Sequence, residues 1–328
     1  MIVDEYTLGN LLYQEAFGDV YLGTKNGSQV KYAILKKDLS GLKKFKEYLD
    51  NELDILKDIN HPNIIKLIDI KEKQDFIYII TEYCNGGKLK QFLEKYSDKA
   101  LPEEIVQHVM RQIIEAIKYL NNKKIMHRHI DLGHFLINYE DKYDKENNNI
   151  MKGKIKLINF QFAKYLKKGE LTKSILGIPL NMSPIILNKL NRIPEYKDAE
   201  YDEKEDIWSL GIICYELLVG KNPFDSNDMG ELVSKVNNGE YFIPITLSKE
   251  AISFINCMLK FDSQKRLSID ELYNHEFLRK NVNEFKKLNL DIINKYEEDS
   301  KIKISTKDDG LIQKLLEKPI SEVKNKEN

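Results

Sequence analysis

The sequence predicts an α+β fold in which a small β-rich lobe is followed by a larger α-helical lobe. The first 81 residues contain short alternating runs that are typical of strands, together with a single helical pattern. From residue 88 to residue 280 the apolar residues recur mainly at helical spacing. Strands followed by helices indicate the α+β class. The length of 328 residues agrees with two domains of roughly 150 residues each.

In the small lobe, strands are expected in the runs YTLGNLLY, DVYLGT and QVKYAIL, and again over 64–70 and 76–81. Residues 42–59 are strongly charged but carry apolar residues at helical spacing, so this stretch predicts a helix. The NGG sequence at 85–87 indicates a turn or hinge, after which the helical character begins.

In the larger lobe, Pro102 begins a long predicted helix. Two short strands, 135–138 and 154–158, enclose a polar and Asn-rich stretch that we expect to be a solvated hairpin insertion. The Lys-rich tail, 281–328, is expected to be partly helical or disordered. Its two weakly amphipathic pieces, 285–296 and 311–316, are candidates for docking on the body of the protein or on a partner.

Composition excludes several classes of function. Lys and Arg number 51 against 52 Asp and Glu, and this balance argues against a nucleic-acid binder that works by neutralising phosphates. There is no run of 18 apolar residues for a membrane span and no N-terminal pattern of a signal peptide. Three scattered cysteines are too few for a disulfide framework or a zinc site, so a cytoplasmic protein is expected.

Seven segments then follow one another in a familiar order: NELDILKDINHPNIIKL, IITEYCNGGKL, IMHRHIDLGHFLI, IKLINFQFAKYL, GIPLNMSPIIL, EDIWSLGIICYELLVGKNPF and QKRLSIDELYNHEFL. Over about residues 6–280 this series resembles the eukaryotic serine/threonine protein kinases, and most of all their autophagy-initiating group. The resemblance implies the two-lobed protein-kinase fold. Its parts would be an N-lobe at 1–81, a hinge at 82–87, a C-lobe at 88–280 and a C-terminal tail at 281–328.

The resemblance also shows which phosphate-binding positions are altered. Of the glycine-rich loop only Gly18 remains, while Tyr13 adds bulk and Glu15 adds a negative charge where phosphates would lie. The strand lysine of the family corresponds to Leu35 if Ala33 keeps its place, because the two residues share one face of a strand. A β-bulge would bring Lys36 to that position instead.

The remaining catalytic positions are altered as well. The family's base aspartate corresponds to His129, and the lysine that steadies the phosphoryl group corresponds to Asp131. The two magnesium ligands correspond to His134 and Asn159, whose side chains suit that ion poorly. No intact catalytic residue is therefore expected.

Two alternatives involve the same loop. Zinc could bind to His129, Asp131 and His134, although the expectation favoured here is that no metal binds. Arg128, which in active relatives receives a phosphate from the activation segment, could meet a phosphate on Thr172 or Ser174, or could cap backbone carbonyls.

Positions that hold the family's lobes together are kept. They correspond to Glu52, Leu56, Leu67, His127, Phe160, Asp206 and Arg266. Arg266 lacks its usual glutamate, because Ile185 stands there, so a buried Arg266 would need another acid or backbone carbonyls. The residues expected around an ATP pocket are Val20, Ala33, Lys36, Thr81, Glu82, Cys84 and Leu136.

The resemblance and the altered positions together predict a pseudokinase. It would not be an enzyme but a scaffold or an allosteric or assembly partner of other proteins, either an active kinase or a larger assembly. No cofactor is expected, and ATP would bind without magnesium at best. The alternative is a weak, unconventional ATP-dependent serine/threonine protein kinase that uses Lys36, Glu52 and His129.

Overall fold

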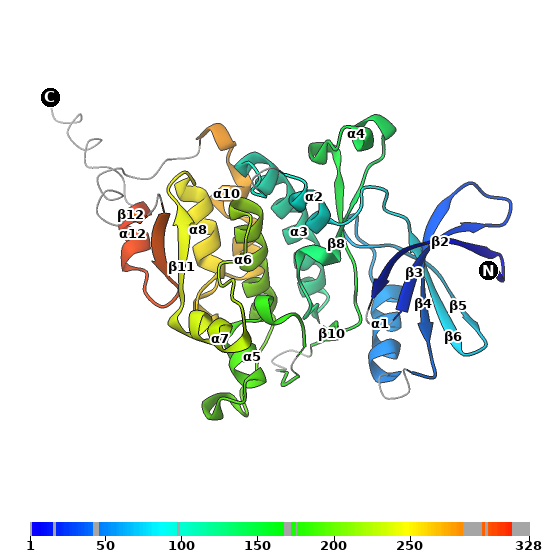
Figure 1. The fold of residues 1–328 in the computed structure, drawn as a ribbon, viewed down its shortest axis with the longest axis horizontal. Coiled ribbons are helices and arrows are strands. Elements are labelled where there is room, and N and C mark those ends of the chain that lie inside the picture. Colours follow the sequence, from blue (N-terminus) through cyan, green and yellow to red (C-terminus); the bar gives the residue numbers. More distant parts are fainter. Residues whose placement is uncertain are drawn as a thin grey trace. The chain divides into compact units, whose positions relative to one another are not determined.

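A computed structural model describes eight stretches of the chain, namely 2–15, 18–41, 46–96, 99–166, 172–174, 176–284, 297–298 and 301–316. The chain divides into two compact units (Figure 1). Unit 1 comprises Met1–Gln91 and Gly133–Tyr165, and unit 2 comprises Phe92–Leu132 and Leu166–Asn328. Unit 1 is rich in strands and unit 2 in helices, so the expected α+β class is confirmed.

Unit 1 is built on a six-stranded antiparallel sheet with the strand order β1-β2-β3-β4-β6-β5. The strands are β1 (Ile2–Val3), β2 (Tyr6–Glu15), β3 (Gly18–Lys25), β4 (Lys31–Asp38), β5 (Leu67–Lys73) and β6 (Phe76–Glu82). Helix α1 (Lys46–Asp58) buries one apolar stripe, as its spacing predicts, and Glu52 lies within that stripe.

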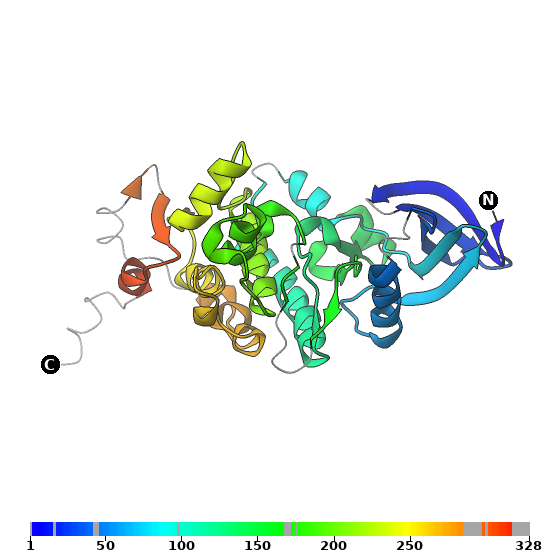
Figure 2. The ribbon, with the colours of Figure 1, turned by 90° about the horizontal axis from the view of Figure 1, so that it is seen from below.

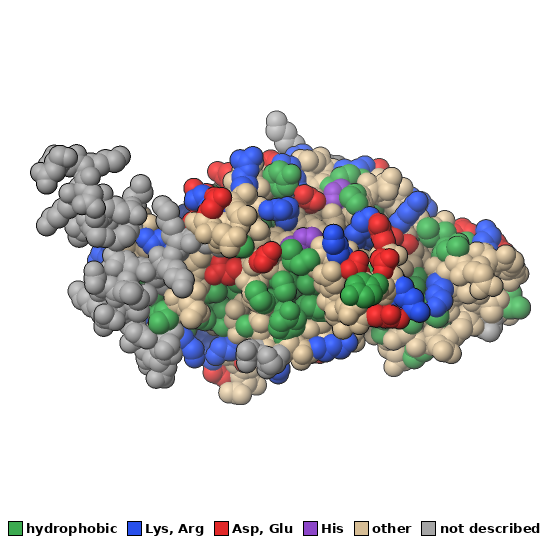
Figure 3. Space-filling view, turned by 90° about the horizontal axis from the view of Figure 1, so that it is seen from above, with side chains coloured by type: hydrophobic (Ala, Val, Ile, Leu, Met, Phe, Trp, Pro, Cys, Tyr) green, Lys and Arg blue, Asp and Glu red, His purple; other side chains and the backbone are tan. Residues whose placement is uncertain are grey.

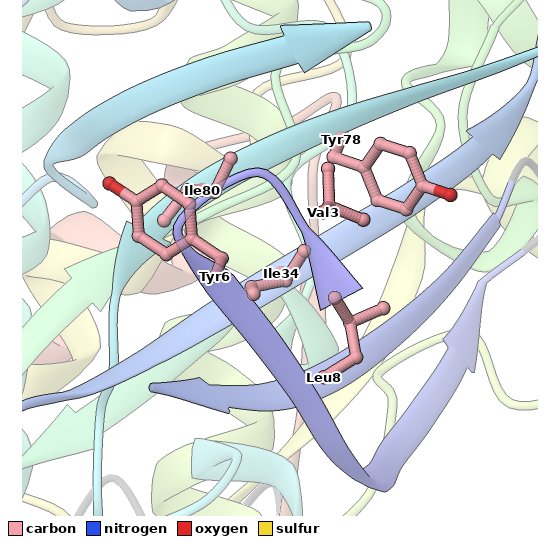
Figure 4. Close-up of a cluster of buried hydrophobic side chains, with 6 residues drawn as sticks. All are labelled: Val3, Tyr6, Leu8, Ile34, Tyr78 and Ile80. Atoms are coloured by element: carbon pink, nitrogen blue, oxygen red, sulfur yellow. The ribbon is translucent and has the colours of Figure 1, made fainter. Parts of the chain in front are cut away.

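One face of this sheet carries its own apolar cluster, shown in Figure 4. Val3, Tyr6, Leu8, Ile34, Tyr78 and Ile80 are all buried there. The hydroxyl groups of Tyr6 and Tyr78 point away from the centre of the cluster. Because side chains alternate along a strand, Ile34 faces this cluster while its neighbours in β4 face the opposite side.

The segment 133–165, expected in the C-lobe, belongs to unit 1. It contains β8 (Phe135–Asn138), β9 (Lys154–Leu157), the short helix α4 (Lys142–Glu146) and β10 (Lys164–Tyr165). Strands β8 and β9 pair with each other, and their backbones also bond to the rest of unit 1: Gly86 N–H donates to Ile137 O at 2.8 Å, and Ile65 N–H donates to Leu157 O at 2.9 Å. These bonds, which have no local sequence signal, explain why the division differs from the expected boundaries.

Unit 2 is centred on α6 (Lys204–Val219), a helix that is buried on nearly every side. Within it, Trp208 is fully buried and stacks on Phe224 with ring centroids 5.6 Å apart. Around it, unit 2 includes α3 (Glu103–Asn122), β7 (Ile125–Met126), α5 (Pro184–Leu190), α7 (Met229–Asn238), α8 (Lys249–Met258), α9 (Ile269–Tyr273) and α10 (Glu276–Arg279). Helix α2 (Leu89–Glu94) spans the division between the units.

Part of the tail is ordered within unit 2, as Figure 1 and Figure 2 show. Strand β13 (Lys301–Ser305) lies between β11 (Glu240–Pro244) and β12 (Glu297–Glu298), and α12 (Gly310–Leu316) follows it. Helix α12 contains the expected piece 311–316, whereas β12 and β13 were not expected. The other expected piece, 285–296, lies outside the described residues.

No helix in the described part of the chain is long and apolar enough to cross a membrane. On the face drawn in Figure 3, lysine and arginine side chains are interspersed with aspartate and glutamate side chains. This mixture agrees with the near-zero net charge of the whole sequence.

Candidate active site

Unit 1 contains an open hollow of about 560 Å³, a volume that includes the solvent at its mouth. Its walls are mostly apolar, with a few polar groups on strands β2 and β6, on α1 and just after β9. The lining residues are Tyr13, Glu15, Val20, Ala33, Leu35, Glu52, Leu56, Ile65, Ile79, Thr81, Leu136, Ile158, Asn159 and Phe160.

Four of the residues expected around ATP meet in this hollow: Val20, Ala33, Thr81 and Leu136. Glu82 and Cys84 do not line it. The Glu82 carboxylate accepts a hydrogen bond from Lys156 Nζ at 2.7 Å, and Cys84 is buried, which raises the pKa of its thiol to about 12. The two side chains therefore stabilise the structure around the hollow and do not form part of its surface.

The buried Glu52 carboxylate is paired with an unexpected residue, Lys37. Lys37 Nζ lies 2.5 Å from Glu52 Oε2, and both side chains are about 95 % buried. Leu35 lines the hollow, as expected for the altered lysine position. Lys36 does not, because its ammonium lies over the Phe76 ring, 3.9 Å from the centroid. The expectation that Lys36 lines the ATP pocket is corrected accordingly.

At another part of the hollow, Asn159 and His134 are bonded to each other. Asn159 Nδ2 and His134 Nε2 are 2.9 Å apart, and both residues belong to unit 1. Asn159 has a φ of +66°, a conformation that asparagine tolerates better than most residues. The pair is neutral when the imidazole is unprotonated, so it attracts a divalent cation far less than the family's carboxylate would.

The hairpin of β2 and β3 lies beside the hollow, and its two strands pair as far as Glu15 and Gly18. Gly18 has a φ of +153°, and a Cβ there would lie 2.3 Å from Lys36 O, which explains why this glycine is kept. Tyr13 lies under the Lys88 ammonium, 4.3 Å from the ring centroid. The expected bulk and charge at this hairpin, Tyr13 and Glu15, do line the hollow.

In unit 2, the Asp206 carboxylate fixes the start of the loop that follows β7. It accepts the N–H groups of His127 at 2.8 Å and of Arg128 at 2.9 Å, so α6 anchors this loop. Burial raises the pKa of Asp206 to about 6, partly offset by these two bonds. His129 lines a separate hollow of about 320 Å³ within unit 2, together with Arg128 and Asp206.

Arg266 is buried, and Glu205 supplies the acid that the family's position, Ile185, lacks. Its Nη1 atom donates to Glu205 Oε1 at 3.0 Å, and the guanidinium also donates to the carbonyls of Lys204, Lys260 and Phe261. Burial raises the pKa of Glu205 to about 7, and the Arg266 charge opposes this shift. Glu205 directly precedes Asp206, so α6 supplies both anchoring acids.

The phosphate switch and the zinc site, the two alternatives considered for this loop, stay predictions. Thr172 is 3 % exposed, and its backbone pairs with Tyr201, near the Arg128 guanidinium. His129 and Asp131 belong to unit 2, whereas His134 belongs to unit 1 and is bonded to Asn159.

A family model described as the protein kinase domain matches residues 6–278. The chain belongs to the protein kinase family. It is 31 % identical over 289 residues to serine/threonine-protein kinase atg1 of Dictyostelium discoideum, and 34 % identical over 236 residues to serine/threonine-protein kinase ULK3 of Xenopus laevis. It is 29 % identical over 282 residues to serine/threonine-protein kinase ATG1c of Arabidopsis thaliana.

These three alignments cover 86 %, 71 % and 84 % of the chain but only 40 %, 46 % and 36 % of the respective relatives. The chain thus spans less than half the length of the curated relatives that it matches. The matches confirm the resemblance to eukaryotic serine/threonine kinases of the autophagy-initiating group.

The expectation that the chain is not an enzyme is contradicted by these comparisons. Its domain is that of the protein kinases, and its relatives are named as serine/threonine-protein kinases. That expectation treated the loss of a lysine at position 35 as the loss of the lysine–glutamate pair. The pair is present, with Lys37 in place of the residue at 35.

Two buried ion-pair partners, Lys37 and Glu205, were not predicted from the sequence, although each position carried some signal. Ala33, Leu35 and Lys37 alternate along β4 and share a face, so the period that selected Leu35 also pointed to Lys37. In the register with β6, these residues lie opposite Thr81, Ile79 and Ile77. The acid at Glu205 was visible beside Asp206, but nothing local showed that it meets Arg266.

Proposed function

We propose that the chain is an unconventional ATP-dependent serine/threonine protein kinase in which Lys37 replaces the usual strand lysine. One observation carries the proposal: the buried ion pair between Lys37 and Glu52 beside the apolar hollow of unit 1. In kinases the corresponding pair positions an ammonium group for the phosphates of ATP.

Burying two charges is costly unless they pair closely. A contact of 2.5 Å between the Lys37 ammonium and the Glu52 carboxylate meets this condition. Lys37 lies two residues beyond Leu35, a step of about 6.6 Å along a strand. A lysine side chain has four methylene groups, so it can compensate for part of such a step by changing rotamers.

The remaining chemistry is assigned by position in the family. His129 would act as the general base that accepts the proton of the substrate hydroxyl, a role that an imidazole can fill near neutral pH. Asn159 and His134 offer one amide oxygen and imidazole nitrogens in place of a carboxylate. We therefore expect nucleotide to bind without a strict need for magnesium.

Val20, Ala33 and Leu136 support the nucleotide part of the proposal, since they form apolar walls that suit a planar base. The protein partners in this proposal are substrates that present a serine or threonine hydroxyl, in keeping with the names of the relatives. Association with another kinase or a larger assembly is a further proposal of the same kind.

The test is transfer of labelled γ-phosphate from ATP to a mixture of serine- and threonine-containing peptides. We expect wild-type transfer to fall at least about tenfold in Lys37→Met and in His129→Ala, because each loses a group that acts on the transferred phosphoryl or proton. Lys36→Met is the matched control and should keep most of the activity, since its ammonium lies on Phe76.

Equal activity in wild type and Lys37→Met would refute the role of Lys37. If neither wild type nor any variant transfers phosphate to the peptides, and none of them binds ATP, the proposed enzyme is refuted. Circular dichroism of each variant separates a loss of chemistry from a loss of folding.

A further inference from the structure

We propose that Glu15 is a specificity-determining residue that makes the hollow of unit 1 favour nucleosides over their phosphorylated forms. The inference rests on the proposed function, because it takes the hollow to be a nucleotide site. It adds a prediction that the resemblance to kinases does not contain, namely that each added phosphate weakens binding rather than strengthening it.

Glu15 is the last residue of β2, and its carboxylate lines the hollow. The side chain is only partly exposed, yet in the described part of the chain no hydrogen bond or ion pair to its carboxylate is present. Most carboxylates enclosed to this degree are paired. An unpaired one at the rim of a ligand pocket is available to interact with whatever enters.

The charged groups that face Glu15 are each engaged elsewhere. Lys37 is bonded to Glu52, His134 to Asn159, and the Lys88 ammonium lies on the Tyr13 ring. Burial raises the pKa of Glu15, and the nearby cations oppose this shift without bonding to it. Within the described residues, none of these positively charged side chains therefore forms a direct ion pair with the Glu15 carboxylate.

The rest of the hollow distinguishes the two ends of a nucleotide. Val20, Ala33 and Leu136 can hold a planar base on apolar walls, an interaction that is independent of phosphate charge. The phosphates enter beside Tyr13 and Glu15. Because Glu15 is only partly exposed, repulsion between its carboxylate and a phosphate is screened less than it would be at a fully exposed site.

The experiment measures Kd values by calorimetry for adenosine, ADP and ATP in the presence of EDTA, which removes divalent ions from the comparison. For wild type we expect affinity to fall from adenosine to ATP. In Glu15→Gln, ATP should bind about tenfold more tightly while the affinity for adenosine changes less than twofold. A drop in KM for ATP with little change in kcat should accompany the shift.

Asp19→Asn is the matched control, because Asp19 lies on the same hairpin but bonds to Gln14 and Tyr21 and does not line the hollow. It should leave all three affinities unchanged. Glu15→Ser serves as a second variant if Glu15→Gln fails to fold.

An unchanged ratio of ATP to adenosine affinity in Glu15→Gln, with both ligands still binding, overturns this inference and leaves the proposed kinase intact. If Asp19→Asn shifts the ratio of ATP to adenosine affinity as much as Glu15→Gln does, the inference also fails. The proposed kinase function is not affected by that outcome. Absence of binding by every ligand to every variant overturns the inference together with the proposed function.

Discussion

The guanidinium of Arg266 donates a hydrogen bond to the Glu205 carboxylate at 3.0 Å, and both side chains are almost fully buried in unit 2. In the protein kinase family the acid for this arginine comes from the position of Ile185, at the start of α5. Here the first turn of α6 supplies it instead. The need to neutralise a buried guanidinium is thus met by a different element of the fold.

Removal of this acid should destabilise the protein strongly. We expect Glu205→Ala to lower the free energy of unfolding by roughly 3–5 kcal/mol, because it leaves a buried arginine without a counter-ion. The double variant Glu205→Ala with Ile185→Glu should recover part of the loss by returning an acid to the family's position. Urea denaturation measures both values, and a double variant no more stable than the single one would speak against the exchange of partners.

Lys36 and Lys37, which are neighbours in β4, should respond very differently to removal of their charge. Lys37→Met leaves the buried Glu52 carboxylate unpaired, so we expect a loss of about 3–5 kcal/mol in the free energy of unfolding. Lys36→Met removes only a cation–π contact with Phe76, for which roughly 0.5–1 kcal/mol is expected. Equal losses for the two variants, measured by urea denaturation, would contradict the assignment of Lys37.

His275 should contribute to acid sensitivity. Burial lowers the pKa of His275 to about 4. Its Nδ1 atom accepts the Phe277 N–H at 3.1 Å, and its Nε2 atom lies 3.1 Å from Ser253 Oγ, so the folded state favours the neutral ring. Since the folded pKa lies below the unfolded value, this stabilisation is complete above about pH 6.5 and is lost as the pH falls towards 4.

The His275→Asn variant can still cap α10 but cannot titrate. The difference in unfolding free energy between wild type and this variant should therefore shrink by up to about 3 kcal/mol between pH 7 and pH 4. Taking this difference also cancels the opposite trend from Glu205 and Asp206, whose raised pKa values reduce stability as the pH rises. A difference that does not vary with pH would exclude the proposed role of His275.

The tail should be an integral part of unit 2. Ile304 is 1 % exposed and lies opposite Tyr241, so Ile304→Ala should lower the free energy of unfolding by about 2–5 kcal/mol. Lys303 is on the other face of β13 and makes an exposed ion pair with Glu240. Lys303→Ala should therefore change the free energy of unfolding by less than about 1 kcal/mol. Thermal and urea unfolding measure both changes, and an equal response of the two variants would mean that the tail is dispensable.

Close packing at Gly239 agrees with this view of the tail. Gly239 has a φ of +73°, and a Cβ there would lie 2.3 Å from Thr306 Oγ1. Backbone bonds join the same two residues, with Thr306 N–H donating to Gly239 O at 2.6 Å. The period-2 pattern of Ile302 and Ile304 was a signal for this strand, but the charged surroundings concealed it.

Local patterns in the sequence determined the α+β class, the strands of unit 1, helix α1 and the apolar walls formed by Val20, Ala33 and Leu136. These features depend on residue period and on motif order, both of which are written along the chain.

The tertiary structure alone decided which acid meets Arg266, which lysine meets Glu52, and that the segment 133–165 joins the first unit. It also decided that β13 pairs with β11. Such partners are distant in sequence. Residue period can place a side chain on one face of a strand, but reach, burial and the cost of an unpaired charge decide which distant residue it meets.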